Sequence, residues 1–126
     1  SRNIVKRINP RTNEVDGEWD QLPQGPLAIT TGAGAVWVTA AGGDVVARID
    51  PVTDAVLTKE VGDLPTAVAV GHGSVWVANA GDGTVSRIDP ETLEIEATIR
   101  VGASPEAIAA TDRVVLVATS AALETQ

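Results

Sequence analysis

The chain has 126 residues, a formal net charge of −8 and no cysteine. The lack of cysteine excludes disulfides, thiolate metal sites and a cysteine nucleophile, and the acidic surplus disfavours nucleic acid because its phosphates would be repelled. The longest apolar runs fall far short of the ~20 residues that a bilayer-spanning helix needs, so we predict no membrane insertion.

The apolar runs are short, rich in Val, Ile and Thr, and divided by Gly, Asp-Pro or Asn-Pro. Such runs are typical of β-strands joined by tight turns, and no stretch has the spacing of a capped helix. The predicted strands are an opening pair at about 3–9 and 13–20, four in the clearest repeat at about 66–71, 74–79, 84–89 and 93–101, and a closing pair at about 106–111 and 114–119.

Internal repeats set the organisation of the chain. Pro26, Pro65 and Pro105 lie 39 and 40 residues apart, and Trp37 and Trp76 lie 39 residues apart. A period of ~40 residues is typical of solenoids and propellers. The repeat is therefore the structural unit, and we expect one domain spanning 1–126.

The four strands of a repeat differ in polarity. The first two, at 67–70 and 75–78, are small or apolar on both faces, whereas the fourth, at 94–100, alternates and carries charge. This gradient predicts a sheet that runs from a buried first strand to a solvated outer strand. Four-stranded sheets repeated at this period are the blades of a β-propeller.

Three motifs of the clearest repeat carry a family resemblance. The segments 73–79 (GSVWVAN), 83–90 (GTVSRIDP) and 97–102 (ATIRVG), followed by Pro105, resemble the YVTN-type propeller repeat, which is related to NHL repeats. The resemblance implies an all-β propeller that serves as a surface-layer, sensor or scaffold domain, or occasionally as an enzyme. The first repeat departs from the pattern at 17–23, and the last lacks the Gly-x-Gly and Trp of its sisters.

The opening and closing strand pairs complement one another. The chain opens with third and fourth strands, holds two full repeats, and closes with first and second strands, so it amounts to about three blades of four antiparallel strands, one of them split. Known propellers need about four to eight blades to close. We therefore predict a homodimer that forms one six-bladed ring, with a fragment of a longer propeller as the alternative.

Several residues could carry a catalytic or binding function, but a structural role explains each of them better. Asn9, Asp50 and Asp89 each precede a proline, which is typical of a hairpin turn. Trp37 and Trp76 suit a core wedge more than a ligand platform, and Trp19 is expected to be half exposed.

The recurrent arginines Arg7, Arg48 and Arg87 could line an anion site, but pairing with a carboxylate or carbonyl of the neighbouring blade is preferred.

His72, the one histidine, has no partner to activate and is interpreted as a turn residue. The segment 79–83 lacks the later Glu of a calcium loop and is interpreted as a hairpin turn. No cofactor or metal site is predicted.

The loops joining second to third strands and one blade to the next share one end of a propeller. The polar residues expected on this face are Gln21, Gln24, Asp44, Asp63, Asn79, Asp82 and Ser104. We predict a non-enzymatic module, or a sensor or scaffold, that binds a peptide, a protein or a small polar ligand there, as an extracytoplasmic part of a larger bacterial protein.

Two alternatives remain open. One is a lyase resembling the streptogramin-inactivating propellers, which use a histidine and a divalent cation; the single His72 is expected on the opposite face. The other is a split or engineered self-assembling scaffold without a ligand.

Overall fold

The computed structural model describes residues 3–120, which form strands and turns. No helix capable of spanning a membrane occurs among these residues. Their strands are β1 (Val5–Asn9), β2 (Glu14–Trp19), β3 (Pro26–Gly32), β4 (Ala35–Ala40), β5 (Val45–Ile49), β6 (Val56–Glu60), β7 (Pro65–Gly71), β8 (Ser74–Asn79), β9 (Thr84–Ile88), β10 (Ile95–Arg100), β11 (Pro105–Ala110) and β12 (Val115–Thr119).

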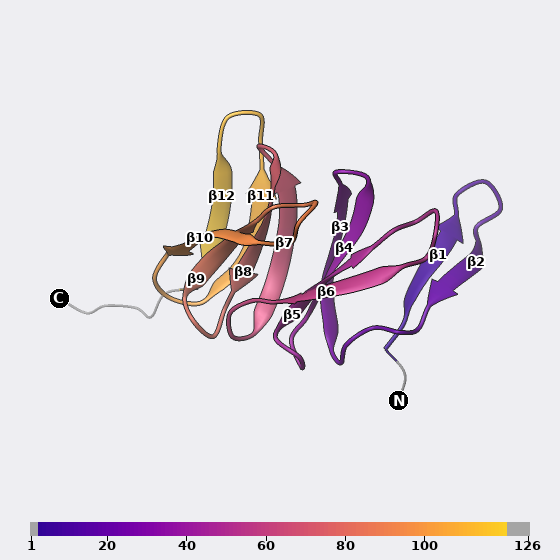
Figure 1. The fold of residues 1–126 in the computed structure, drawn as a ribbon, viewed down its shortest axis with the longest axis horizontal. Helices are drawn as coiled ribbons and strands as arrows, with labels where there is room; N and C mark the ends of the chain where they lie inside the picture. Colours follow the sequence, from indigo (N-terminus) through magenta and orange to yellow (C-terminus); the bar gives the residue numbers. More distant parts are fainter. Residues whose placement is uncertain (1–2, 121–126) are drawn as a thin grey trace.

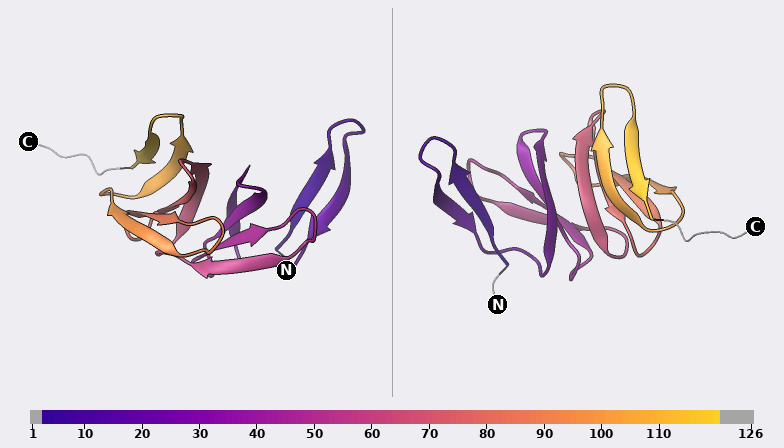
Figure 2. Two further views of the ribbon diagram at one scale, coloured as in Figure 1. Left: turned by 45° about the horizontal axis from the view of Figure 1, so that its top comes forward. Right: turned by 180° about the vertical axis from the view of Figure 1, so that it is seen from behind.

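The strands form two four-stranded and two two-stranded antiparallel sheets. Strands β3 to β6 pair in sequence order as the first sheet, and β7 to β10 pair in the same way as the second sheet. At the ends, β1 pairs with β2 as the N-terminal hairpin, and β11 pairs with β12 as the C-terminal hairpin. The sheets follow one another as an open fan with the hairpins at its two ends (Figures 1 and 2).

The predicted strand pattern is confirmed, with ends that move by one or two residues. The strand expected to begin at 93 begins at Ile95. The reason is local, because Leu93 has a φ of 64° and still belongs to the turn. An extended strand cannot contain a residue in this left-handed region.

Burial follows the predicted gradient in the second sheet, whereas the first strand of the first sheet, β3, has no buried residue. Every residue of β8 is buried, whereas most of β10 is exposed. The first strand β7 contacts both β3 and β11, so the first strands of successive sheets lie side by side. The first strand of the second sheet is therefore covered by a neighbour on each side, and the fourth strands form the outer rim.

Glycines allow the first strands to approach closely. A Cβ atom on Gly32 would lie 2.7 Å from Cγ1 of Val70, and one on Gly71 would lie 2.6 Å from Cβ of Ala110. Real Cβ atoms do not tolerate such distances. The glycine that ends each first strand thus sets the spacing between adjacent sheets.

Two tryptophans fill the space between sheets. Trp37 is fully buried and packs in one cluster with Val68 and Val77 of the second sheet. Its Nε1–H donates to the carbonyl of Gly32 at 3.0 Å, and Trp76 repeats this bond to Gly71 at 2.9 Å. The prediction that both tryptophans are core residues is confirmed.

Candidate functional site

The predicted loop face lies at one end of the sheets. It consists of the turns after β4 and β8 and of the links that precede β3, β7 and β11. Backbone hydrogen bonds join each turn to a link, for example Gly81 N–H to the Asp63 carbonyl at 2.9 Å. The face is thus a continuous surface made by successive sheets.

The three predicted aspartates, Asp44, Asp63 and Asp82, lie around the link at 62–64. Oδ2 of Asp82 accepts the backbone N–H of Asp63 at 2.8 Å, and Oδ1 of Asp44 accepts the backbone N–H of Leu64 at 3.0 Å. Each of these two carboxylates uses one oxygen to hold the link. The three side chains form the candidate acidic site.

The other predicted residues contribute differently. Gln24 and Ser104 accept backbone bonds through their carbonyls, from Gly42 at 3.0 Å and Ser120 at 2.9 Å. Gln21 lines a separate cavity of about 200 Å³ beside Trp19.

Asn79 is a structural residue of this face. Its side chain is fully buried, and Nδ2 donates to Thr84 Oγ1 at 3.2 Å and to Ser86 Oγ at 3.0 Å. Its Oδ1 is buried without a hydrogen-bond partner. A ligand at the acidic site would therefore meet the aspartates and not this amide.

The Asx turns at the opposite end agree with their structural interpretation. Oδ1 of Asp50 accepts the backbone N–H groups of Val52 at 2.8 Å and Thr53 at 3.2 Å. These bonds stabilise the ionised form and hold the pKa of Asp50 below its ordinary value. The backbone N–H groups of Thr92 and Glu91 lower the pKa of Asp89 in the same way.

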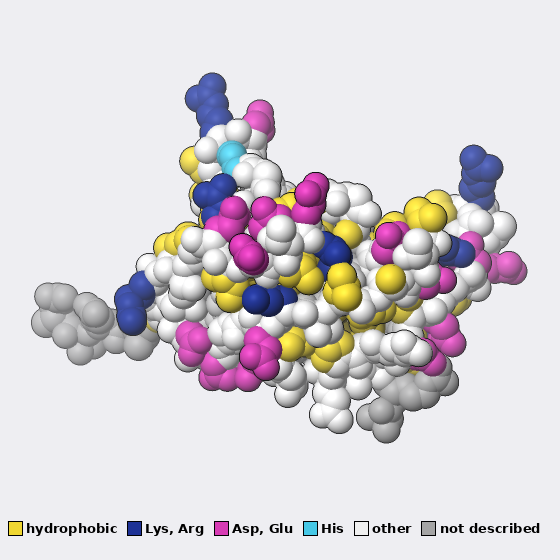
Figure 3. Space-filling model, in the orientation of Figure 1, with side chains coloured by type: hydrophobic (Ala, Val, Ile, Leu, Met, Phe, Trp, Pro, Cys, Tyr) yellow, Lys and Arg dark blue, Asp and Glu magenta, His cyan; other side chains and the backbone are white. Residues whose placement is uncertain are grey.

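The histidine lies in the turn between β7 and β8, at the end opposite the acidic site. His72 has a φ of 55°, and its carbonyl accepts a bond of 3.3 Å from Nη2 of Arg87. Among residues 3–120, no group of three or more His, Cys, Asp or Glu side chains is placed to hold a metal ion. Acidic side chains are spread over the visible surface among Lys and Arg (Figure 3).

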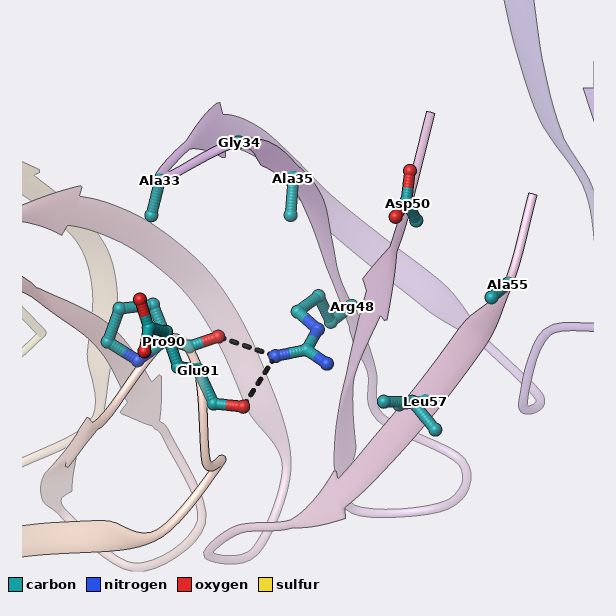
Figure 4. Close-up of a pocket in the computed structure, with 9 residues that line it drawn as sticks. All are labelled: Ala33, Gly34, Ala35, Arg48, Asp50, Ala55, Leu57, Pro90 and Glu91. Carbon is teal, nitrogen blue, oxygen red and sulfur yellow. Dashed lines mark hydrogen bonds between the residues drawn. The ribbon is translucent and has the colours of Figure 1, made fainter. Parts of the chain in front are cut away.

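A cavity of about 360 Å³ between the two four-stranded sheets was not predicted (Figure 4). Arg48 crosses it, and Nη1 donates to the carbonyls of Pro90 at 2.6 Å and Glu91 at 2.9 Å. The predicted pairing with the neighbouring blade thus holds for Arg48, but it is wrong for Arg7 and Arg87, which bind Asp16 and Ser74 of their own sheets. A sequence signal existed, because Ala35 and Leu57 line the cavity where the sister repeat has polar residues.

The two ends of the fan expose apolar side chains that their sister positions bury. Ile8 is 64% exposed, whereas Ile49 and Ile88 at the same place in the full sheets are 0% exposed. At the other end Leu116 is 57% exposed, although Trp37 at the equivalent place is fully buried. These end surfaces therefore lack the neighbour that covers each inner sheet.

Solved structures of β-propeller proteins resemble this fold. Hydrazine synthase of Kuenenia stuttgartiensis superposes with a TM-score of 0.72 at 27% identity, over 76% of this chain and 29% of that chain. Apo AztD of Citrobacter koseri superposes with a TM-score of 0.72 at 15% identity, over 86% of this chain and 32% of that chain. The dihydro-heme d1 dehydrogenase NirN in complex with DHE superposes with a TM-score of 0.67 at 18% identity, over 91% of this chain and 27% of that chain.

The chain spans only 27% to 32% of the length of these structures. No protein-family model matches it, and no curated protein matches it. The narrower YVTN resemblance therefore stays a prediction. What the comparisons and the sheets establish together is an all-β chain of four-stranded antiparallel sheets, arranged as in β-propeller proteins.

Proposed function

We propose that the chain is a non-enzymatic β-propeller module that assembles with a second copy of itself by completing a shared sheet. The observation that carries this proposal is the complementarity of the two hairpins. The C-terminal hairpin has the pairing of first and second strands, and the N-terminal hairpin has that of third and fourth strands. Joined in trans, they make one four-stranded sheet.

The register of that sheet follows from the complete ones. In the second sheet Trp76 lies opposite Arg87 and Val77 opposite Ser86, and the first sheet repeats this pattern. The same register places Leu116 of one copy opposite Arg7 of the other. Both side chains are exposed in the single chain, and pairing would cover the apolar end surfaces.

Arginine geometry supports the same arrangement. Arg48 reaches the turn at 90–91 of the next sheet, whereas Arg87 lies 4.6 Å over the ring of Trp76 in its own sheet. In the assembled ring, the turn at 10–11 of the second copy would lie beside Arg87, as the turn at 90–91 lies beside Arg48. We expect Arg87 to turn toward the carbonyls there, as Arg48 does.

Two copies would supply six blades, which lies within the usual range for closed propellers. A two-fold axis pairs both open edges at once, because each copy offers the edge that the other lacks. In a competing arrangement, further repeats of a longer protein cover the same edges. The short length of the chain relative to its structural neighbours supports this alternative.

The role of the assembled module would be that of a scaffold with an acidic loop face. Asp44, Asp63 and Asp82 gather there and offer carboxylate oxygens to a cationic or hydrogen-bonding ligand. The alternative lyase chemistry gains no support from His72, whose hydrogen bond to Arg87 is made by its backbone carbonyl.

Cysteine cross-linking tests the proposed pairing, since the natural chain has no cysteine. A variant with Arg7→Cys and Leu116→Cys places the two thiols directly opposite each other, about 5 Å apart between Cβ atoms. Mild oxidation should then give a covalent dimer on a non-reducing gel.

The matched control combines Leu116→Cys with Lys6→Cys. A shift of one residue turns the side chain to the other face of the sheet, so this variant should cross-link far less. Equal cross-linking of both variants, or none in a folded sample, would contradict the proposal.

A further inference from the structure

Arg87 and Arg48 occupy the same place in successive sheets but differ in their partners. Nε of Arg87 donates to Ser74 Oγ at 2.8 Å and lies 3.7 Å from Oε1 of Glu96. Ser74 Oγ also donates to that carboxylate oxygen at 3.0 Å, and Nη2 of Arg87 bonds to the carbonyl of His72. In the second sheet a carboxylate and a hydroxyl therefore satisfy the guanidinium.

The first sheet lacks both of these groups. Ala35 stands in the place of Ser74, at the start of the second strand. Leu57 is the cross-strand partner of Arg48, where the second sheet has a bulge that brings Glu96 beside the arginine. Two substitutions thus remove the hydroxyl and the carboxylate but keep the arginine.

Arg48 consequently keeps part of its guanidinium unbound. Nη1 donates both of its hydrogen bonds, to the carbonyls of Pro90 and Glu91 (Figure 4). Nε and Nη2 have no hydrogen-bond partner among residues 3–120. A guanidinium edge with two parallel N–H groups matches a carboxylate in a bidentate geometry.

The space around this edge suits a small ligand. The cavity of about 360 Å³ lies within the range of small-molecule sites. The lining surface is more polar than apolar, and its aliphatic part beside Arg48 comes from Ala33, Ala35, Ala55 and Leu57.

Two acidic residues, Asp50 and Glu91, line the cavity and limit the negative charge that it accepts. Asp50 borders it, and Oδ1 of this side chain is already held by two backbone N–H groups. A second negative charge on a ligand would therefore be repelled.

We propose that this cavity binds a small monocarboxylate with a short apolar substituent, whose carboxylate takes the place that Glu96 holds in the second sheet. The site is built within one chain, from β4, β5, β6 and the turn at 90–91. No residue of a second copy is therefore needed to line it.

The first test titrates butyrate into the full chain by isothermal calorimetry or NMR. Saturable binding is expected, and 1-butanol of similar size should not bind. Arg48→Gln should weaken butyrate at least about tenfold, because the charge-assisted pair is lost. Arg100→Gln makes the same change of charge away from the cavity and should leave butyrate binding unchanged.

A grafted variant separates recognition from folding. Ala35→Ser combined with Leu57→Glu rebuilds the partner set of Arg87 around Arg48 without removing the arginine. Butyrate should no longer bind, while native tryptophan fluorescence, to which the buried Trp37 contributes, reports that the fold is retained. The proposal is overturned if the natural chain shows no saturable binding, if 1-butanol binds equally, or if a folded grafted variant binds butyrate as before.

Discussion

The backbone N–H of Asp63 donates a hydrogen bond of 2.8 Å to Oδ2 of Asp82, which ties the link before β7 to the turn after β8. We expect Asp82→Ala to lower the free energy of unfolding by about 1 kcal/mol, because the amide loses its acceptor. Asp82→Asn keeps an oxygen acceptor and should cost less. Urea denaturation followed by tryptophan fluorescence measures both, and equal losses would show that the bond does not stabilise the link.

The acidic site should bind cations. A short lysine peptide should bind more weakly as salt is raised, because exposed charges are screened beyond ~10 Å at 0.1 M ionic strength. Asp44→Asn and Asp82→Asn should each weaken it further, and Asp112→Asn in the β11–β12 turn is the control of equal charge. Unchanged affinity in both site variants would place the ligand elsewhere.

Much of the fold was predictable because it repeats. A turn proline, a second-strand tryptophan and a third-strand arginine recur at nearly constant spacing, so a weak local signal is confirmed by its copies. Strand ends were less predictable, since the left-handed conformation of Leu93 depends on its turn and leaves no mark in the residue type.

The site was less predictable than the fold for a physical reason. The sequence placed Asn79 with Asp82 on a loop face, but only packing decides that the amide turns inward and the carboxylate outward. The Arg48 cavity depends on what Ala35 and Leu57 lack relative to the sister repeat. Aligned repeats show that Ala35 and Leu57 replace polar residues. The consequence for Arg48 follows only once the structure shows that those polar residues bind Arg87.

The Asx turns should make the fold sensitive to acid. Backbone N–H groups lower the pKa of Asp50 and Asp89 in the folded chain. A carboxyl with a lowered folded pKa adds stability above its unfolded pKa of ~3.9, and this stability is lost as the pH falls through the folded value. The double variant Asp50→Asn and Asp89→Asn should therefore lose less stability below about pH 4.

Urea midpoints at pH 7 and pH 3 measure this effect, with the surface variant Asp112→Asn as the control. An acid loss in the double variant as large as in the natural chain would show that these turns do not carry the pH dependence.

Trp37 should be the most sensitive position of the core between the sheets. It is fully buried, and its indole N–H is bonded to Gly32. Trp37→Ala should cost about 3–5 kcal/mol through the cavity that it leaves, whereas the exposed Val52→Ala should stay within about 0.5 kcal/mol. Thermal unfolding followed by circular dichroism compares the two variants. Similar losses of stability in both would show that Trp37 is not a core residue packed between the sheets.

Two copies should complete one another's open sheets. Multi-angle light scattering on the folded chain, over a range of concentrations, tests this assembly most directly. We predict the mass of two chains, with dissociation on dilution accompanied by loss of native tryptophan fluorescence, because assembly and folding are linked. The mass of a single chain with native fluorescence retained would contradict the account.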